Sequence, residues 1–233
     1  MIGVLVPARN EAQCIGRCIE AVLHASLHPA LEGEQVSVLV AADGCTDATA
    51  SIARQAGAQV VEVAPPGGVG LARGTAAEIL IARGARWLAM TDADSVVPAD
   101  WLAVQLASRC EVFCGMVQVA DWEGYGDIVA SQFSALHPQQ AGHAHVHGAN
   151  LGLSSAAYRR CGGFLPLLTG EDRQLVERCH QLGLRIARSS AGIVETSARR
   201  QARAPAGFSD YLKALEQRLV TELHAPSSIA PAL

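Results

Sequence analysis

The segment WLAMTDADSVVPADW, residues 87–101, places two aspartates directly behind a short apolar run. Trp87–Met90 is predicted to be a buried strand, and Asp92 and Asp94 follow it with a single residue between them. Aspartates favour helix starts, and Pro98 is typical of one, so a capping role is the first interpretation. Acid–base chemistry is a second, and binding of a divalent cation that contacts phosphate oxygens is a third.

The composition favours one domain with an aliphatic core. The chain has 233 residues, of which 50% are hydrophobic and only 4% are aromatic. This is enough apolar material for a sizeable core. The formal net charge is -4, and Lys213 is the sole lysine. Because a nucleic-acid-binding surface needs clustered Lys and Arg, we expect no nucleic-acid partner.

The cysteines and the N-terminal residues indicate a soluble, cytoplasmic protein. Cys14 and Cys18 lie on the apolar face of a predicted helix and fit core positions better than a zinc site. Reduced thiols are therefore expected. The start MIGVLVPARNE has no basic segment before its apolar run, so no signal peptide is predicted, and no run approaches the ~20 residues of a membrane span. Peripheral membrane contact and the oligomeric state stay open.

The first half of the chain alternates between strand and helix patterns. Apolar runs predict strands, and residues 12–25 carry an apolar stripe at the helical period. The strands are expected at 2–6, 36–42, 60–63 and 87–91, and the helices at 12–25, 46–56 and 71–83. This alternation predicts an α/β fold with a Rossmann-like, mostly parallel central sheet flanked by helices.

The second half predicts a mixed arrangement. Residues 111–119 fit an antiparallel strand, and residues 121–147 show no convincing long element. A short strand is expected at 149–153, and helices are expected at 154–161, 171–182 and 208–223. We predict a single domain over 1–225, with a first half at 1–98, a second half at 99–225, and a flexible tail at 226–233.

Polar residues follow each of the four predicted parallel strands. Ligands of open α/β sheets bind at the carboxyl ends of the strands. These ends deliver Pro7, Arg9, Asn10 and Glu11 after the first strand, Asp43 after the second, Gly67, Gly68, Gly70 and Arg73 after the third, and Asp92 and Asp94 after the fourth. Three of the four ends carry a carboxylate, which helix capping alone does not predict. The segment GGVGLARG matches a dinucleotide fingerprint only weakly, and we interpret it as a flexible loop that lets the backbone approach a ligand.

Five segments resemble family 2 glycosyltransferases, which are nucleotide-sugar enzymes of the GT-A fold. They occur in the family's order: VLVPARNEAQCIGRCIEAVL, VAADGCTDAT, TDADSVVPADWL, GANLGLSSAAYRRCGGF and GEDRQLVERCHQLGLRI. The resemblance covers about residues 2–188. Within the predicted domain it implies a nucleotide-sugar-binding half at 1–98 and an acceptor-binding half at 99–225. It implies that the loop with Pro7, Arg9, Asn10 and Glu11, together with Asp43, lines the nucleotide base and ribose, and that Arg73 faces the donor.

The same resemblance implies roles for three aspartates. Asp92 and Asp94 would form the family's D-x-D motif, with Asp94 the closer metal ligand and Asp92 on ribose or metal. Asp172, with Glu171 beside it, would be the catalytic base. The chemistry agrees, because Mn²⁺ or Mg²⁺ accepts one or two carboxylates and stabilises a leaving diphosphate. Ordinary acidic residues at a helix start are the alternative for Glu171 and Asp172.

Two further clusters carry open interpretations. His143, His145 and His147 share one side of an extended segment and are either a solvated polar face or metal ligands, with His147 the first choice as ligand. Arg199, Arg200 and Arg203 lie without nearby acids in the sequence. They form either a solvated loop or a clamp for the donor diphosphate or a phosphorylated acceptor. The Q-x-x-R-W motif of processive members is absent, which argues against a polysaccharide synthase.

These observations predict a metal-dependent, inverting glycosyltransferase, expected to be a hexosyltransferase. It would move a sugar from a UDP- or GDP-sugar to a hydroxyl-bearing acceptor. A sugar-nucleotide pyrophosphorylase-like nucleotidyltransferase is one alternative, although PARNEA lacks the Gly-rich loop with Arg and Lys that it would need. A non-catalytic nucleotide-sugar-binding protein of the same fold is the other.

Overall fold

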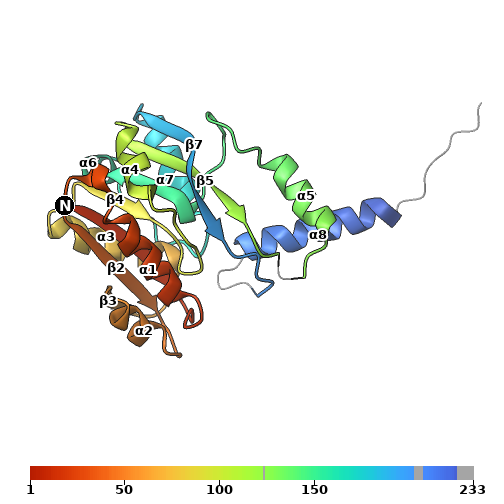
Figure 1. Cartoon of the computed structure of the whole chain (residues 1–233), viewed down its shortest axis with the longest axis horizontal. Helices are drawn as coiled ribbons and strands as arrows, with labels where there is room; N and C mark the ends of the chain where they lie inside the picture. Colours follow the sequence, from red (N-terminus) through yellow and green to blue (C-terminus); the bar gives the residue numbers. More distant parts are fainter. Residues whose placement is uncertain (123, 202–206, 225–233) are drawn as a thin grey trace, which may run out of the picture.

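A mixed β-sheet forms the centre of the computed structural model, which describes residues 1–122, 124–201 and 207–224 (Figure 1). Within these residues the sheet has seven strands in the order β3-β2-β1-β4-β6-β5-β7. The strands are β1 (Ile2–Ala8), β2 (Val36–Asp43), β3 (Gln59–Val63), β4 (Trp87–Met90), β5 (Val112–Val119), β6 (Leu151–Ser154) and β7 (Ile186–Thr196). β1 to β4 are mutually parallel, and β6 is antiparallel to both β4 and β5.

Successive apolar side chains of the strands point to opposite faces of the sheet, so helices cover both faces. Ile2, Val4 and Val6 of β1 pack against α1 (Ile15–Ala25), α2 (Thr49–Gln55) and α4 (Trp101–Ala107). Leu5 points to the opposite face. That face is covered by α3 (Val69–Ala82), α6 (Ser155–Arg160) and α7 (Glu171–Gln181). Short 3₁₀ turns at Pro29–Leu31 and Gly148–Asn150 complete the connections.

Two helices lie beside the sheet rather than on its faces. α5 (Asp127–Leu136) and α8 (Phe208–His224) pack against each other at one end of the molecule (Figure 1). Their shared apolar cluster contains Val129 and Phe133 of α5 and Leu212 and Leu215 of α8. This cluster is separate from the two large cores on the sheet.

The first half follows the predicted alternation, with boundaries displaced by only a few residues. The second half corrects two expectations. The predicted absence of a long element in 121–147 is wrong, because α5 lies there. Its apolar signal is weak, since only Val129 and Phe133 are buried while Ile128 and Leu136 are exposed.

The strand at β5 was expected to be antiparallel, and it is so only toward β6. On its other side it pairs in parallel with β7, with a register shift between Gly115 and Val117. β7 itself escaped prediction because IARSSAGIVET lacks apolar alternation, as is common in a partly exposed edge strand. Residues 226–233, the predicted tail, lie outside the described residues. Among the described helices, none combines the length and the apolar character that crossing a membrane requires.

Candidate active site

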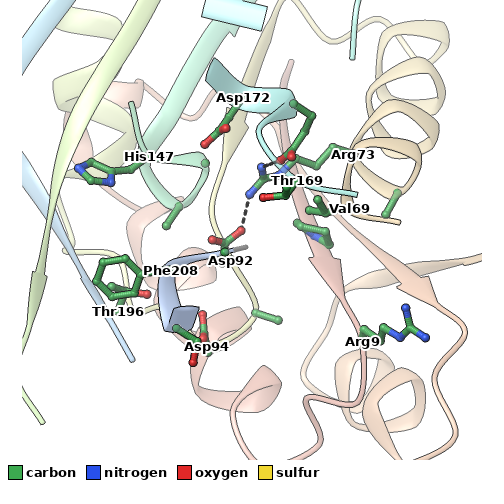
Figure 2. A pocket seen from close by; sticks show the side chains of 18 of the residues that line it. Arg9, Val69, Arg73, Asp92, Asp94, His147, Thr169, Asp172, Thr196 and Phe208 are labelled. Atoms are coloured by element: carbon green, nitrogen blue, oxygen red, sulfur yellow. Dashed lines mark hydrogen bonds and ion pairs between the residues drawn. The ribbon is translucent and has the colours of Figure 1, made fainter. Parts of the chain in front are cut away.

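A pocket of about 440 Å³ opens at the carboxyl ends of the parallel strands (Figure 2). It brings together most of the residues that the sequence singled out: Pro7, Arg9, Glu11, Asp43, Arg73, Asp92, Asp94, His147, Asp172 and Arg199. Asp92 lies near the centre of the view, with Arg9 and Val69 on one side and His147 and Phe208 on the other (Figure 2). The shared edge of the sheet explains this convergence, because parallel strands end together.

Asp92 and Asp94 are each held by an arginine from another part of the chain. Asp92 Oδ1 lies 2.5 Å from Nη2 of Arg73, and Asp94 Oδ2 lies 3.2 Å from Nη2 of Arg199. Burial raises the pKa of Asp94 to about 6, and the charges of Asp92 and Glu11 add to this while Arg199 opposes it. A carboxylate that is costly to charge gains from a nearby cation. Asp94 therefore offers a suitable ligand for a divalent metal.

Arg73 is the buried centre of the site. Its side chain is only 3% exposed, and its two terminal nitrogens contact Asp92 and the equally buried Glu171. Burial opposes the charged form of Arg73, but Asp92, Glu171 and Asp172 outweigh that effect and raise its pKa. Gly148 makes room for this arrangement, because a Cβ there would lie 2.3 Å from the guanidinium. Arg73 lines the pocket, and its guanidinium is paired with protein carboxylates.

Glu171 and Asp172 differ sharply although they are neighbours. Gly170 precedes α7 in the left-handed conformation, and the two acids occupy the first turn of the helix. Both line the pocket, but Glu171 is buried on Arg73, whereas Asp172 is partly exposed and its Oδ1 accepts a hydrogen bond of 2.7 Å from the backbone N–H of Arg173. Of the two, only Asp172 has a partly exposed carboxylate available to a ligand. Glu171 is thus a structural partner of Arg73.

Arg199 and Arg200 of the arginine cluster are each paired with acids that do not lie beside them in the sequence. Arg199 bridges Glu11, at 2.6 Å, and Asp94. Arg200 lies outside the residues that line the pocket, pairs with Glu216 and covers the Tyr125 ring at 4.1 Å. The acids are distant in sequence, so the local pattern could not reveal them. Arg203 lies outside the described residues.

The remaining nucleotide-side predictions divide between lining and supporting roles. Asn10 does not line the pocket, and its side chain accepts a hydrogen bond of 2.8 Å from the backbone N–H of Thr46. Its positive φ of 55° is one that asparagine tolerates. Asp43 lines the pocket and accepts a hydrogen bond of 3.0 Å from the N–H of Gly68. Asn10 therefore joins the loops that follow β1 and β2.

The glycines of GGVGLARG allow close contacts within the protein. A Cβ on Gly67 would lie 2.0 Å from the Asp43 carboxylate, and one on Gly70 would lie 2.1 Å from the carbonyl oxygen of Leu165. Gly70 also donates a backbone hydrogen bond of 2.9 Å to Leu167. This differs from the expectation of a flexible loop, since the segment is packed against Asp43 and residues 165–167.

The histidines between residues 137 and 147 form a stacked row, and His137 and His147 of this row line the pocket. The rings of His143 and His145 lie 5.9 Å apart, those of His145 and His147 lie 5.8 Å apart, and His137 stacks on His145 at 4.5 Å. Burial, followed by the neighbouring histidines and Arg173, lowers the pKa of His147 to about 3. Among the described residues no group of three or more His, Cys, Asp or Glu is arranged to hold a metal ion. A metal role for His147 gains no support from this geometry, and the seven cysteines are free.

Several pocket residues were not singled out from the sequence. They are His137, Thr169, Thr196, Phe208 and Tyr211. Phe208 and Thr196 lie together on the side of Asp92 away from Arg9, and Thr169 lies beside Arg73 (Figure 2). Phe208 and Tyr211 belong to the apolar face of α8, which the sequence presents as ordinary helix packing. No local signal separates a pocket-lining aromatic from a core aromatic.

The donor set fits a divalent cation bound together with a diphosphate. Mn²⁺ and Mg²⁺ prefer oxygen ligands and accept one or two carboxylates besides phosphate oxygens. Asp94 and Asp92 supply such carboxylates on the pocket surface. Because phosphate oxygens are ligands as well, such a cation does not require a group of three or more protein ligands. The nearest cations are the guanidinium groups of Arg73 and Arg199.

Solved structures share this fold at low sequence identity. Staphylococcus aureus TarS 1–349 in complex with UDP-GlcNAc aligns with a TM-score of 0.67 and 16% identity over 92% of this chain and 65% of that chain. Mannosyltransferase PcManGT from Pyrobaculum calidifontis, in complex with GDP-Man and Mn²⁺, aligns with a TM-score of 0.62 and 16% identity over 100% of this chain and 76% of that chain.

Glucosyl-3-phosphoglycerate synthase from Mycobacterium tuberculosis, in complex with Mn²⁺ and UDP-glucose, aligns with a TM-score of 0.56 and 20% identity over 96% of this chain and 77% of that chain. This chain spans less than two thirds of the TarS 1–349 chain. No curated protein matches it. The model of the family described as Glycosyl transferase family 2 matches residues 3–159, which is more than half of the chain. With the predicted GT-A fold confirmed by these neighbours, the chain belongs to glycosyl transferase family 2.

Proposed function

We propose that the chain transfers a hexosyl group from a UDP- or GDP-sugar to an acceptor hydroxyl, with inversion and with Mn²⁺ or Mg²⁺. The observation that carries this proposal is the convergence of Asp92, Asp94 and Asp172 on one pocket. Family membership supports it, as do structural neighbours that bind UDP-GlcNAc, UDP-glucose or GDP-mannose. Family membership does not favour the nucleotidyltransferase alternative.

The proposed reaction assigns the proton and the leaving group to opposite sides of the donor sugar. The Asp172 carboxylate accepts the acceptor's hydroxyl proton as the hydroxyl oxygen bonds to the anomeric carbon. The bond from that carbon to the diphosphate oxygen breaks, and its electron pair leaves with the nucleoside diphosphate. A divalent cation would stabilise that negative charge. Asp94, with Asp92, would hold the cation, and Pro7, Arg9, Glu11 and Asp43 would line the nucleotide.

Calorimetry with UDP and GDP tests the donor side directly. We expect nucleotide binding in the presence of Mn²⁺, loss of most affinity in EDTA, and the same loss in Asp94→Ala. Asp100→Ala is the matched control, because Asp100 is exposed and lies outside the pocket. Metal-independent binding that Asp94→Ala leaves intact would contradict the proposal. Mn²⁺-dependent hydrolysis of the sugar donor would separate an enzyme from a binding protein of this fold.

A further inference from the structure

The pocket wall beyond Asp172 differs in charge from the donor side. Glu11, Asp43, Asp92 and Asp94 all line the donor side. On the opposite wall the lining residues are mainly aromatic or uncharged, and Arg173 is the cation among them: His137, Val146, His147, Phe208, Tyr211 and Arg173. Figure 2 shows His147 and Phe208 of this wall on the side of Asp92 away from Arg9, with Asp172 between His147 and Arg73.

Arg173 is unpaired within the described part of the chain. The other pocket-lining arginines face carboxylates, since Arg73 and Arg199 are bound by two acids each and Arg9 lies 3.9 Å from Asp43. The exposed guanidinium of Arg173 has neither an ion pair nor a hydrogen bond with any described residue. An arginine that lines a pocket without a protein anion is suited to bind a carboxylate or phosphate of a ligand.

The pKa shifts of the histidines give separate evidence on the charges near this wall. Burial lowers the pKa of His145 and His147 first, and the neighbouring charges that lower it further are other histidines and Arg173, joined by Arg188 at His145. The largest causes of the two pKa shifts include no carboxylate. The Nε2 atom of His147 is also buried without a hydrogen-bond partner among the described residues. Depending on the tautomer, this nitrogen can donate a hydrogen bond to a ligand hydroxyl at this wall or accept one from it.

We propose that this wall binds an anionic acceptor, a hydroxyl compound whose phosphate or carboxylate group pairs with Arg173 while its reactive hydroxyl lies at Asp172. His147 would contact a hydroxyl of the same molecule. The inference rests on the proposed function, because it names the class of acceptor for that transfer. It assigns Arg173 as a binding residue, placed one position after the base at the start of an 11-residue helix. The positive end of the helix adds to the attraction for an anion.

Calorimetric titrations with three small probes test the proposal. Glycerol 3-phosphate, glycerate and glycerol share a skeleton and differ in the anionic group. Each is titrated into the free protein and into the protein loaded with UDP or GDP and Mn²⁺. We expect the two anions to bind more tightly than glycerol. We expect Arg173→Gln to weaken them about tenfold or more, as for the loss of a charge-assisted hydrogen bond. The tighter anion identifies phosphate or carboxylate as the preferred group.

Arg159→Gln is the matched control, since Arg159 is exposed at the end of α6 and does not line the pocket. Glycerol binding as tightly as both anions, or a preference for anions that survives Arg173→Gln, would overturn the inference. Failure of UDP and GDP to bind would count against the proposed function instead. In that case the titrations of the free protein still decide whether Arg173 binds anions.

Discussion

Two arginines organise the charges of the candidate site. Arg73 holds Asp92 and Glu171, and Arg199 holds Glu11 and Asp94. Each guanidinium compensates two carboxylates in a partly dry pocket, where unpaired charges are costly. A cation that binds Asp94 would compete with Arg199 for the same oxygen atoms. Of the acids that line the pocket, Asp172 is the one without an ion pair to an arginine of the described part of the chain, in agreement with its proposed role as base.

Replacing Asp172 should separate catalysis from binding. Asp172→Asn keeps the shape of the side chain but removes the proton acceptor, so kcat should fall by ~10²–10⁴ while the donor Kd and Tm hold. Steady-state kinetics and calorimetry measure the two effects. Glu177→Gln is the control, because Glu177 is exposed on the same helix. Equal losses in both variants would remove the assignment of the base.

Glu171→Gln is not a neutral control for the same experiment. Its carboxylate is buried on Arg73, and burial raises its pKa while Arg73 opposes that shift. Losing this charge leaves Arg73 short of one partner, so the variant tests the fold as well as the chemistry.

The start of α3 is the element that most constrains the donor side. Gly68 precedes the helix with φ 114°, and Gly70 lies against the backbone of residues 165–167. Gly74, one turn later, has Phe164 Cβ as its nearest neighbour at 3.8 Å. Glycine is thus required at position 70, where the backbone of residues 165–167 lies too close for a Cβ, but position 74 has room for one.

Alanine at Gly70 and Gly74 should give opposite results. Gly70→Ala forces the 165–167 segment away from α3, and such overpacking costs typically ~1–3 kcal/mol. Gly74→Ala adds only ordinary contacts and gains helix propensity worth ~0.5–1 kcal/mol. Denaturant unfolding measures both. Equal stability of the two variants would show that the 165–167 segment adjusts without cost.

The histidine segment before β6 should make the fold sensitive to acid. The pKa of His147 is lowered to about 3 in the folded protein, whereas an unfolded histidine titrates near ~6.5. Between these values the unfolded chain binds more protons. The free energy of unfolding should therefore fall as the pH drops below about 6.5, by up to ~1.4 kcal/mol per pH unit from His147.

Melting temperatures at about pH 7.5 and about pH 5.5 check this dependence. His147→Gln should reduce the difference between them, and His180→Gln should not, since His180 is exposed on α7. If His147→Gln loses as much melting temperature as the wild type, then His147 does not account for the acid sensitivity.

Across the whole molecule, the pocket forms only when distant segments assemble. Arg73 joins α3 to the end of β4 and to Glu171, which lies 98 residues away in the chain. α5 and α8 stand beside the sheet (Figure 1). His137, which directly follows α5, and Phe208 and Tyr211 of α8 complete the pocket wall. Both halves of the chain therefore contribute to a single site.

Removing Arg73 should destabilise this assembly. Arg73→Met leaves the buried Glu171 without its counter-charge, and breaking a buried pair in this way costs ~3–5 kcal/mol. Arg86→Met is the matched control, because Arg86 pairs with Glu34 at the surface, where such pairs contribute ~0–1 kcal/mol. Urea unfolding measures both variants, and Arg73→Met combined with Glu171→Met should recover part of the loss. Similar small losses for Arg73→Met and Arg86→Met would contradict the central role of Arg73.

The sequence by itself determined the parallel half of the sheet and the acids at its edge. Apolar runs and helical periodicity are local properties, so β1 to β4 and the positions of Asp43, Asp92 and Asp94 follow from short stretches of chain. The family motifs indicated Asp172 in the same way. Only the tertiary structure decided which acid each arginine holds, that Arg200 faces Glu216 outside the pocket, and that α5 and α8 form a pocket wall. These features depend on strand register and on the meeting of distant side chains, which no local pattern encodes.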